Sequence, residues 1–258
     1  EADVRAPKYK TGFDRNFWIW EEFDPNHTYL LAADVARGDG KDYSVFHIFK
    51  IETMEIVGEY QGKVTPDLFS NLITNAGKEY GNCMVVVENN SVGYSVLEKL
   101  RETEYPNIYF SFKTSHEYVE QHIAELKNNT VAGFTMSMKT RPLVVAKLEE
   151  FVRNKLITIY SSRILSEMKT FVWHNGKPQA MKKYNDDLII ACAIGCWVKE
   201  TAFEVSERDL NYKKAFLNSM VYTNTKINTT IPGMSGYKKT QDHEDRKKYE
   251  QFSWLIKG

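Results

Sequence analysis

Hydrophobic runs separated by polar turns begin at Tyr29 and indicate a β-sheet. Each run is rich in β-branched or aromatic residues, and this pattern predicts three successive strands, at 29–36, 43–51 and 54–61. The first two are separated by the glycine-containing loop "RGDGKD", and the turn "ETM" precedes the third. Three consecutive strands joined in this way predict an antiparallel meander.

Helices and strands alternate in the next part of the chain. A helix is expected over 65–81, with Thr65 as its N-cap and Gly81 at its end. The continuous apolar run at 83–87 is typical of a strand buried on both faces. A helix within 89–102 and a strand over 107–112 follow, and this strand, helix and strand predict a parallel crossover.

The remaining apolar segments predict more helices and one hairpin. Residues 113–134 are polar and irregular, and an amphipathic helix with proline at its start follows over 141–153. The later expected elements are a strand at 156–160, a helix at 163–169, a hairpin turning at Asn175-Gly176, and a helix at 185–200 that is apolar almost all round and therefore buried.

These elements divide the chain into three parts. Residues 1–28 are expected to be a linker and edge segment, 29–199 one α/β domain, and 200–258 a polar tail. The chain begins with Glu1 rather than methionine, so we expect it to be the C-terminal part of a longer protein. The irregularly spaced aromatic residues Phe17, Trp18 and Trp20 are expected to pack the edge segment onto the sheet rather than to stack on bases.

Composition excludes several classes of protein. Apolar residues make up 42% and aromatic residues 13% of the 258 residues, which is ordinary for a globular chain. The 34 basic and 34 acidic residues give no net charge, so a nucleic-acid partner would have to bind a local basic patch. No apolar run reaches the roughly 20 residues needed to span a bilayer. Three cysteines within apolar runs suit reduced core thiols of a cytoplasmic protein, without zinc ligation.

Acidic residues stand at the ends of three apolar elements. Asp34 lies on the first strand, Glu88 follows the fourth, and Asp186 and Asp187 head the buried helix. Each acid alone could instead stabilise a turn or interact favourably with a helix dipole. An acid that ends a buried strand is costly, however, unless it is paired, hydrogen-bonded or bound to a cation.

The arrangement of these acids favours a metal site. If the first and fourth strands are neighbours, Asp34 and Glu88 approach each other and repel unless a divalent ion neutralises them. Oxygen ligands alone select Mg²⁺ or Mn²⁺. Two such ions about 4 Å apart would activate a water and stabilise the leaving oxygen of a phosphodiester, which is nuclease chemistry.

Three segments carry a resemblance to a known family. "LAADVARGDGKDYSVFHI", "VVVENNSVGYSVLEKL" and "YNDDLIIACAIGCW" resemble the nuclease domain of the large terminase subunit of tailed bacteriophages, within the ribonuclease H-like superfamily. The resemblance spans about residues 29–199. It implies a mixed sheet of five or slightly more strands flanked by helices, here with an added β-hairpin.

The resemblance also assigns roles to residues. It implies that Asp34, Glu88 and Asp187 are the catalytic and metal-binding triad, with Asp42 and Asp186 as further metal-binding acids. The family pattern of an aromatic residue or His, any residue and then Asp favours Asp187, although Tyr184 stands one place early. Helical phase does not decide between Asp186 and Asp187. Candidates to bind DNA phosphates flank the proposed site at Lys139, Arg141, Lys182 and Lys183, although a surface lysine is more often merely solvated.

The function implied is that of a metal-dependent endonuclease that cuts concatemeric double-stranded DNA with two Mg²⁺ or Mn²⁺ ions. By resemblance the partners are an N-terminal ATPase domain, the capsid portal and a small terminase subunit, with no membrane. The location implied is the host bacterial cytoplasm, at the procapsid portal. Two alternatives remain: a junction resolvase or ribonuclease H-type nuclease of the same fold, or a non-catalytic module that docks on the portal.

Overall fold

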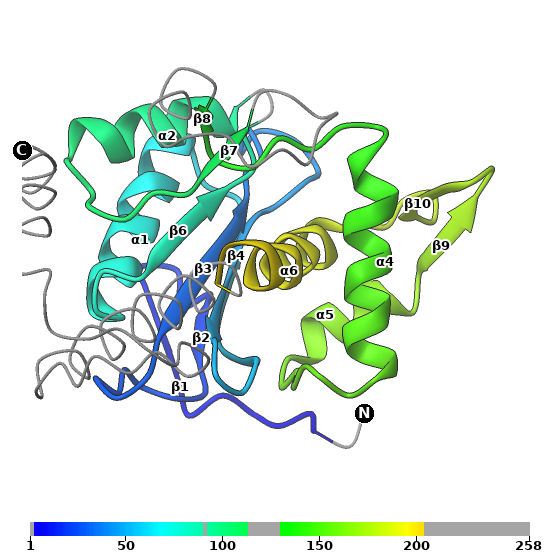
Figure 1. The fold of residues 1–258 in the computed structure, drawn as a ribbon, viewed down its shortest axis with the longest axis horizontal. Helices are drawn as coiled ribbons and strands as arrows, with labels where there is room; N and C mark the ends of the chain where they lie inside the picture. Colours follow the sequence, from blue (N-terminus) through cyan, green and yellow to red (C-terminus); the bar gives the residue numbers. More distant parts are fainter. Residues whose placement is uncertain (1–2, 90–91, 113–129, 204–258) are drawn as a thin grey trace, which may run out of the picture. The chain divides into compact units, whose positions relative to one another are not determined.

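A six-stranded mixed sheet forms the centre of the computed structural model, which describes residues 3–89, 92–112 and 130–203. The strand order is β1-β2-β5-β4-β3-β6 (Figure 1). The predicted antiparallel meander is confirmed, and β6 lies parallel to β3 at the edge of the sheet. The strands are β1 (Tyr9–Thr11), β2 (Phe17–Ile19), β3 (Tyr29–Asp34), β4 (Ser44–Lys50), β5 (Glu55–Gly62) and β6 (Met84–Val87).

Helices cover both faces of this sheet (Figure 1). Along β3, Leu30 and Ala32 face one core cluster while Leu31 and Ala33 face the other, as the alternation of side chains on a strand requires. This double burial explains the continuous apolar runs of β3 and β6. On one face lie α1 (Pro66–Glu79) and α2 (Gly93–Glu102), and on the other lie α4 (Thr140–Arg153), α5 (Ser162–Met168) and α6 (Asp187–Val198).

Helix α6 is the buried helix that the sequence predicts. Every residue from Leu188 to Cys196 is buried, and the helix packs on β3 and β4. Its backbone continues into a short π-helix, η1 (Lys199–Phe203). Because the whole surface of α6 contacts protein, its first residue is held in a fixed position over the sheet.

The hairpin predicted around Asn175-Gly176 is also present. It consists of β9 (Phe171–His174) and β10 (Lys177–Ala180), which form a separate two-stranded sheet. The φ angles of 50° at Asn175 and 72° at Gly176 are those of a type I′ turn, which matches the twist of a two-residue hairpin.

Two predicted strands do not form as regular members of the main sheet. The segment 107–112 bridges β6 only at Ile108 and then turns away, and β7 (Phe110–Phe112) pairs with β8 (Thr130–Ala132). The place beside the end of β6 is taken by Phe134, whose N–H donates to the carbonyl of Val87 at 2.8 Å. The segment 156–160 forms a single bridge, between Thr158 and Glu55, because β2 occupies the rest of that edge of β5.

The N-terminal segment contributes more than an edge contact. β2 pairs with β5, and β1 pairs with β2, so this segment supplies two of the six strands. The predicted division at residue 28 therefore separates strands of one sheet, and the domain limits stay predictions. Most of the predicted tail, 204–258, lies outside the described residues. Among the helices that the structure describes, none has the length and apolarity needed to cross a membrane.

Candidate active site

The two strand-end acids meet at one edge of the sheet. β3 and β6 run parallel as direct neighbours, so their carboxyl ends coincide, and the N–H of Glu88 donates to the carbonyl of Ala33 at 2.9 Å. The side chains of Asp34 and Glu88 lie within hydrogen-bonding distance of each other. The structure thus brings together the two acids that the sequence places at the ends of buried strands.

Burial and like charge together act on Asp34. Burial raises the pKa of this carboxyl group well above its ordinary value of 3.8, and the negative charges of Glu88 and Asp187 raise it further. The hydrogen bond to Glu88 acts in the same direction, and only the backbone N–H of Val35 opposes it. An ionised Asp34 beside Glu88 is therefore unfavourable unless positive charge enters the site.

Asp187 is the first residue of α6 and completes this group of acids. Its Oδ2 accepts hydrogen bonds from the backbone N–H of Tyr43 at 2.8 Å and from Asn185 Nδ2 at 3.2 Å. Burial, together with the charges of Asp42 and Asp186, raises the pKa of Asp187 to about 6. The hydrogen bonds from Tyr43 and Asn185 hold the carboxylate in place while lowering that pKa.

Asp186 has a different environment from Asp187. Its Oδ2 accepts hydrogen bonds from Arg141 Nη2 at 2.6 Å and from the backbone N–H of Ala180 at 3.0 Å. Arg141 also donates through Nε to the carbonyl of Pro178 at 3.1 Å. Asp186 thereby connects α6 to α4 and to the hairpin, which favours Asp187 as the ligand that faces the strand ends.

Replacing Asp186 and Asp187 one at a time tests which of the two is the metal ligand. Asp186→Asn is expected to lower the free energy of unfolding by roughly 1–2 kcal/mol, because it weakens a half-buried ion pair, and to leave nuclease activity measurable. Asp187→Asn is expected to abolish cleavage without that loss of stability. Chemical denaturation and plasmid cleavage of both variants provide the measurements. Loss of cleavage in Asp186→Asn alone would reverse the assignment.

The three acids provide the type of ligand atom that a hard divalent cation prefers. Asp34, Glu88 and Asp187 offer only carboxylate oxygens, and the charges that act on Asp34 from the other two acids are of like sign. Within the described ranges, no three His, Cys, Asp or Glu side chains are grouped as a ready-made metal site. Asp187 is held instead by hydrogen bonds from the backbone N–H of Tyr43 and from the side chain of Asn185.

The other predicted site residues lie around this group. Asp42 is exposed in the loop between β3 and β4, close enough for its charge to act on Asp187. Three predicted DNA-binding residues are exposed: Lys139, Lys182 and Lys183. Arg141 is instead engaged with Asp186 and Pro178. The roles of all these residues stay predictions.

Two residues near the acids, Gly93 and Glu167, have structural roles that the sequence pattern does not indicate. Gly93 begins α2, and a Cβ at this position would collide with the carbonyl oxygen of Glu88, so only glycine lets the helix approach so closely. Glu167 of α5 is buried, and its Oε2 accepts a hydrogen bond from the N–H of Ile189 at 3.2 Å, in the first turn of α6. Burial raises the pKa of Glu167 to about 8.

The fold was compared with protein-family models and with solved structures. No protein-family model matches the chain. The large terminase nuclease of the thermophilic phage G20c with bound magnesium superposes with a TM-score of 0.57 at 17% identity, covering 75% of this chain and 91% of that one. The large terminase nuclease domain of Thermus phage P74-26 gives 0.55 at 17% identity, with coverage of 74% and 88%. The chain has the fold of a phage large-terminase nuclease domain.

The structure confirms the predicted fold class, a mixed sheet flanked by helices with an added hairpin, and the six strands agree with the predicted five or slightly more. The G20c nuclease was also solved with bound cobalt, and that structure has a TM-score of 0.56 to this chain at 16% identity. At identities this low, the structural superposition establishes the shared fold alone. It leaves the chemistry to be argued from the acids at the ends of β3 and β6 and at the start of α6.

Proposed function

We propose that the chain is the metal-dependent endonuclease domain of a viral DNA-packaging terminase. The observation that carries the proposal is the meeting of Asp34 and Glu88 at the carboxyl ends of two adjacent parallel strands, with the charge of Asp187 acting on Asp34 from the start of α6. Two acids that meet at the ends of buried strands, with the charge of a third acting on Asp34, are costly to the fold, and a catalytic role accounts for that cost.

In this proposal the three acids hold two Mg²⁺ or Mn²⁺ ions. Such ions, when bound, activate a water and stabilise the leaving oxygen of a phosphodiester. Asp34 and Glu88 contribute adjacent carboxylates from a rigid sheet edge, and Asp187 contributes a third whose direction is fixed by Tyr43 and Asn185. Because all three stand on buried elements, their relative positions vary little during reaction.

The proposed substrate is concatemeric double-stranded DNA, cut during packaging. The fold likeness to terminase nucleases supports three protein partners: an N-terminal ATPase domain, the capsid portal and a small terminase subunit. The proposed location is the host bacterial cytoplasm, at the procapsid portal. The exposed lysines at 139, 182 and 183 would contribute phosphate contacts.

Linearisation of supercoiled plasmid tests the proposal. We expect cleavage with little sequence preference in Mg²⁺ or Mn²⁺, and none after EDTA is added, because the carboxylates alone cannot activate water at neutral pH. Undiminished cleavage in EDTA would exclude the two-metal mechanism. A chain that binds neither metal nor DNA would instead favour the non-catalytic docking module.

A further inference from the structure

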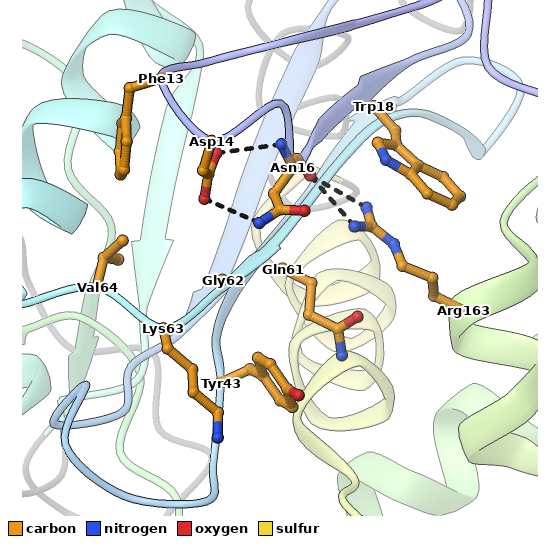
Figure 2. Close-up of a pocket in the computed structure, with 10 residues that line it drawn as sticks. All are labelled: Phe13, Asp14, Asn16, Trp18, Tyr43, Gln61, Gly62, Lys63, Val64 and Arg163. Carbon is orange, nitrogen blue, oxygen red and sulfur yellow. Dashed lines mark hydrogen bonds between the residues drawn. The ribbon is translucent and has the colours of Figure 1, made fainter.

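Figure 2 shows a hollow of about 560 Å³, one of whose lining residues, Tyr43, is hydrogen-bonded to Asp187. Its walls come from the loop before β2, from the end of β5, and from Tyr43 and Arg163. Figure 2 shows side chains of these segments directed around a common space. The volume falls within the range of about 300–1,000 Å³ that is usual for small-ligand sites.

The hollow is connected to the acids through two residues. Tyr43 lines it with its side chain, while its backbone N–H donates to Asp187 Oδ2 at 2.8 Å. Gln61 also lines it and stands in the same row of the sheet as Asp34, because both pair with Val45. Two strand spacings amount to about 10 Å. A DNA strand covers that distance in about three base steps.

Aromatic rings and amides dominate the walls. Phe13 is 67% exposed although it is a large apolar residue, and Trp18 and Tyr43 are partly exposed. Base stacking on such rings is independent of sequence, because every base has a π-face. The amide side chains of Asn16 and Gln61 also line the hollow (Figure 2); their nitrogens donate to Asp14 and Glu167, and their oxygens can accept a hydrogen bond from a base edge.

The charges of the walls indicate where a phosphate would lie. Arg163 is neutralised by Glu59, whose Oε1 accepts from Nε at 2.7 Å, and its guanidinium lies 3.9 Å from the ring centre of Trp18. Lys63 is exposed and forms no ion pair with any described residue, and its Nζ lies 5.0 Å from the ring centre of Tyr43.

Asp14, the acid of this hollow, is already engaged. Its carboxylate accepts hydrogen bonds from the Tyr60 hydroxyl at 2.8 Å and from the backbone N–H and side-chain amide of Asn16. These bonds fix the carboxylate on the wall away from Lys63 and Tyr43 (Figure 2). These donors are neutral, so the charge of Asp14 offsets that of Lys63 in the hollow as a whole, and the positive charge is confined to the wall at Lys63.

We propose that this hollow binds one unpaired nucleotide of a DNA strand whose phosphodiester about three base steps away reaches the acids. The base stacks on the aromatic rings of Phe13 and Tyr43, and the phosphate lies beside Lys63. The proposal rests on the nuclease function and extends it, because it specifies a strand with a locally opened base. Such a site would hold the strand in register with the catalytic group.

A matched pair of double variants tests this site. Phe13→Ala with Lys63→Ala removes one ring and the cation from the hollow, and Phe23→Ala with Lys78→Ala removes the same groups elsewhere on the surface. Both pairs are made in the Asp34→Asn background, so that the DNA is not cut. Binding of a duplex with a fluorescent single-stranded overhang is measured by anisotropy in Mg²⁺. Melting temperatures verify that both variants fold.

We expect the variant of the hollow to bind about tenfold more weakly and the control pair to change binding less than twofold. Replacing the overhang bases by abasic residues should weaken binding to the parent by a similar factor and have no further effect on the variant of the hollow. Photo-cross-linking from 5-iodouracil in the overhang, with the intact hollow, should label residues 11–20 or 41–45.

The outcomes separate this site from the nuclease function. Equal binding by both double variants, or cross-links only elsewhere, overturns the nucleotide site while plasmid cutting by the unmodified chain upholds the nuclease. A chain that neither binds DNA nor cuts plasmid overturns both proposals. Cross-linking to the hollow without an effect of abasic residues would also overturn the site, because stacking of the base is its central claim.

Discussion

Replacing Asp34 with asparagine is expected to reduce DNA cleavage by roughly a thousandfold or more, which corresponds to several kcal/mol of lost transition-state stabilisation. The same change is expected to leave the metal-free protein at least as stable as the parent. The asparagine side chain keeps the shape of the aspartate and removes a buried carboxyl group that lies beside Glu88 and Asp187. Plasmid cleavage and thermal melting in EDTA measure the two effects.

The rise in melting temperature caused by Mn²⁺ gives a third readout. The parent should show this rise because the metal binds only the folded state, and Asp34→Asn should lose most of it. Asp39→Asn is the matched control, since Asp39 is an exposed acid in the loop that follows β3. A destabilised Asp34→Asn variant that still cuts would show that Asp34 serves the turn rather than the metal, at a cost of about 1 kcal/mol.

Replacing Glu167 with glutamine is expected to change how stability depends on pH. The pKa of Glu167 is raised from 4.5 to about 8, first by burial and then by the charges of Asp187 and Glu59. Below pH 4.5 the group is protonated in the folded and unfolded chains alike. As the pH rises from 4.5 to about 8, only the unfolded chain releases this proton, so the folded state loses stability.

The glutamine variant lacks this titration and should gain stability relative to the parent over that range, on the order of a few kcal/mol by pH 8. Its carbonyl oxygen can still accept from the N–H of Ile189, and the Gln61 amide can turn to present its oxygen. Urea denaturation in EDTA from pH 5 to pH 8 measures the difference. Glu79→Gln, at an exposed position, is the control. Parallel pH profiles for Glu167→Gln and the parent would contradict the prediction.

Local patterning was enough to predict most elements of this fold. The meander, α1, β6, α2, α4 and α6 follow from the period of apolar residues, and Asn175-Gly176 fixed the hairpin through its turn conformation. The failures occurred at segments whose pairing is decided by competition for one strand edge. The segments 107–112 and 156–160 have strand-like composition, but Phe134 and β2 occupy the positions that they would need.

The sequence predicted that Asp34 and Glu88 approach each other on the condition that their strands are neighbours, and the pairing of β3 with β6 meets that condition. The sequence could not separate Asp186 from Asp187, since both head α6 and both helix faces are apolar. The tertiary structure distinguishes them by their partners: Arg141 of α4 reaches Asp186, and the loop before β4 reaches Asp187. Those contacts join residues at least 45 positions apart, which no local pattern records.

The sequence by itself determined the fold class, the order of the main elements and the acids at their ends, because burial imposes a period on each strand and helix. Tertiary structure alone decided which polar groups face each acid, how closely Gly93 brings α2 to Glu88, and that Glu167 is buried beside the start of α6. It also created the hollow beside Tyr43 from segments that are ordinary one by one. Burial and proximity depend on how distant segments pack, and these two quantities set the pKa and the reactivity of a side chain.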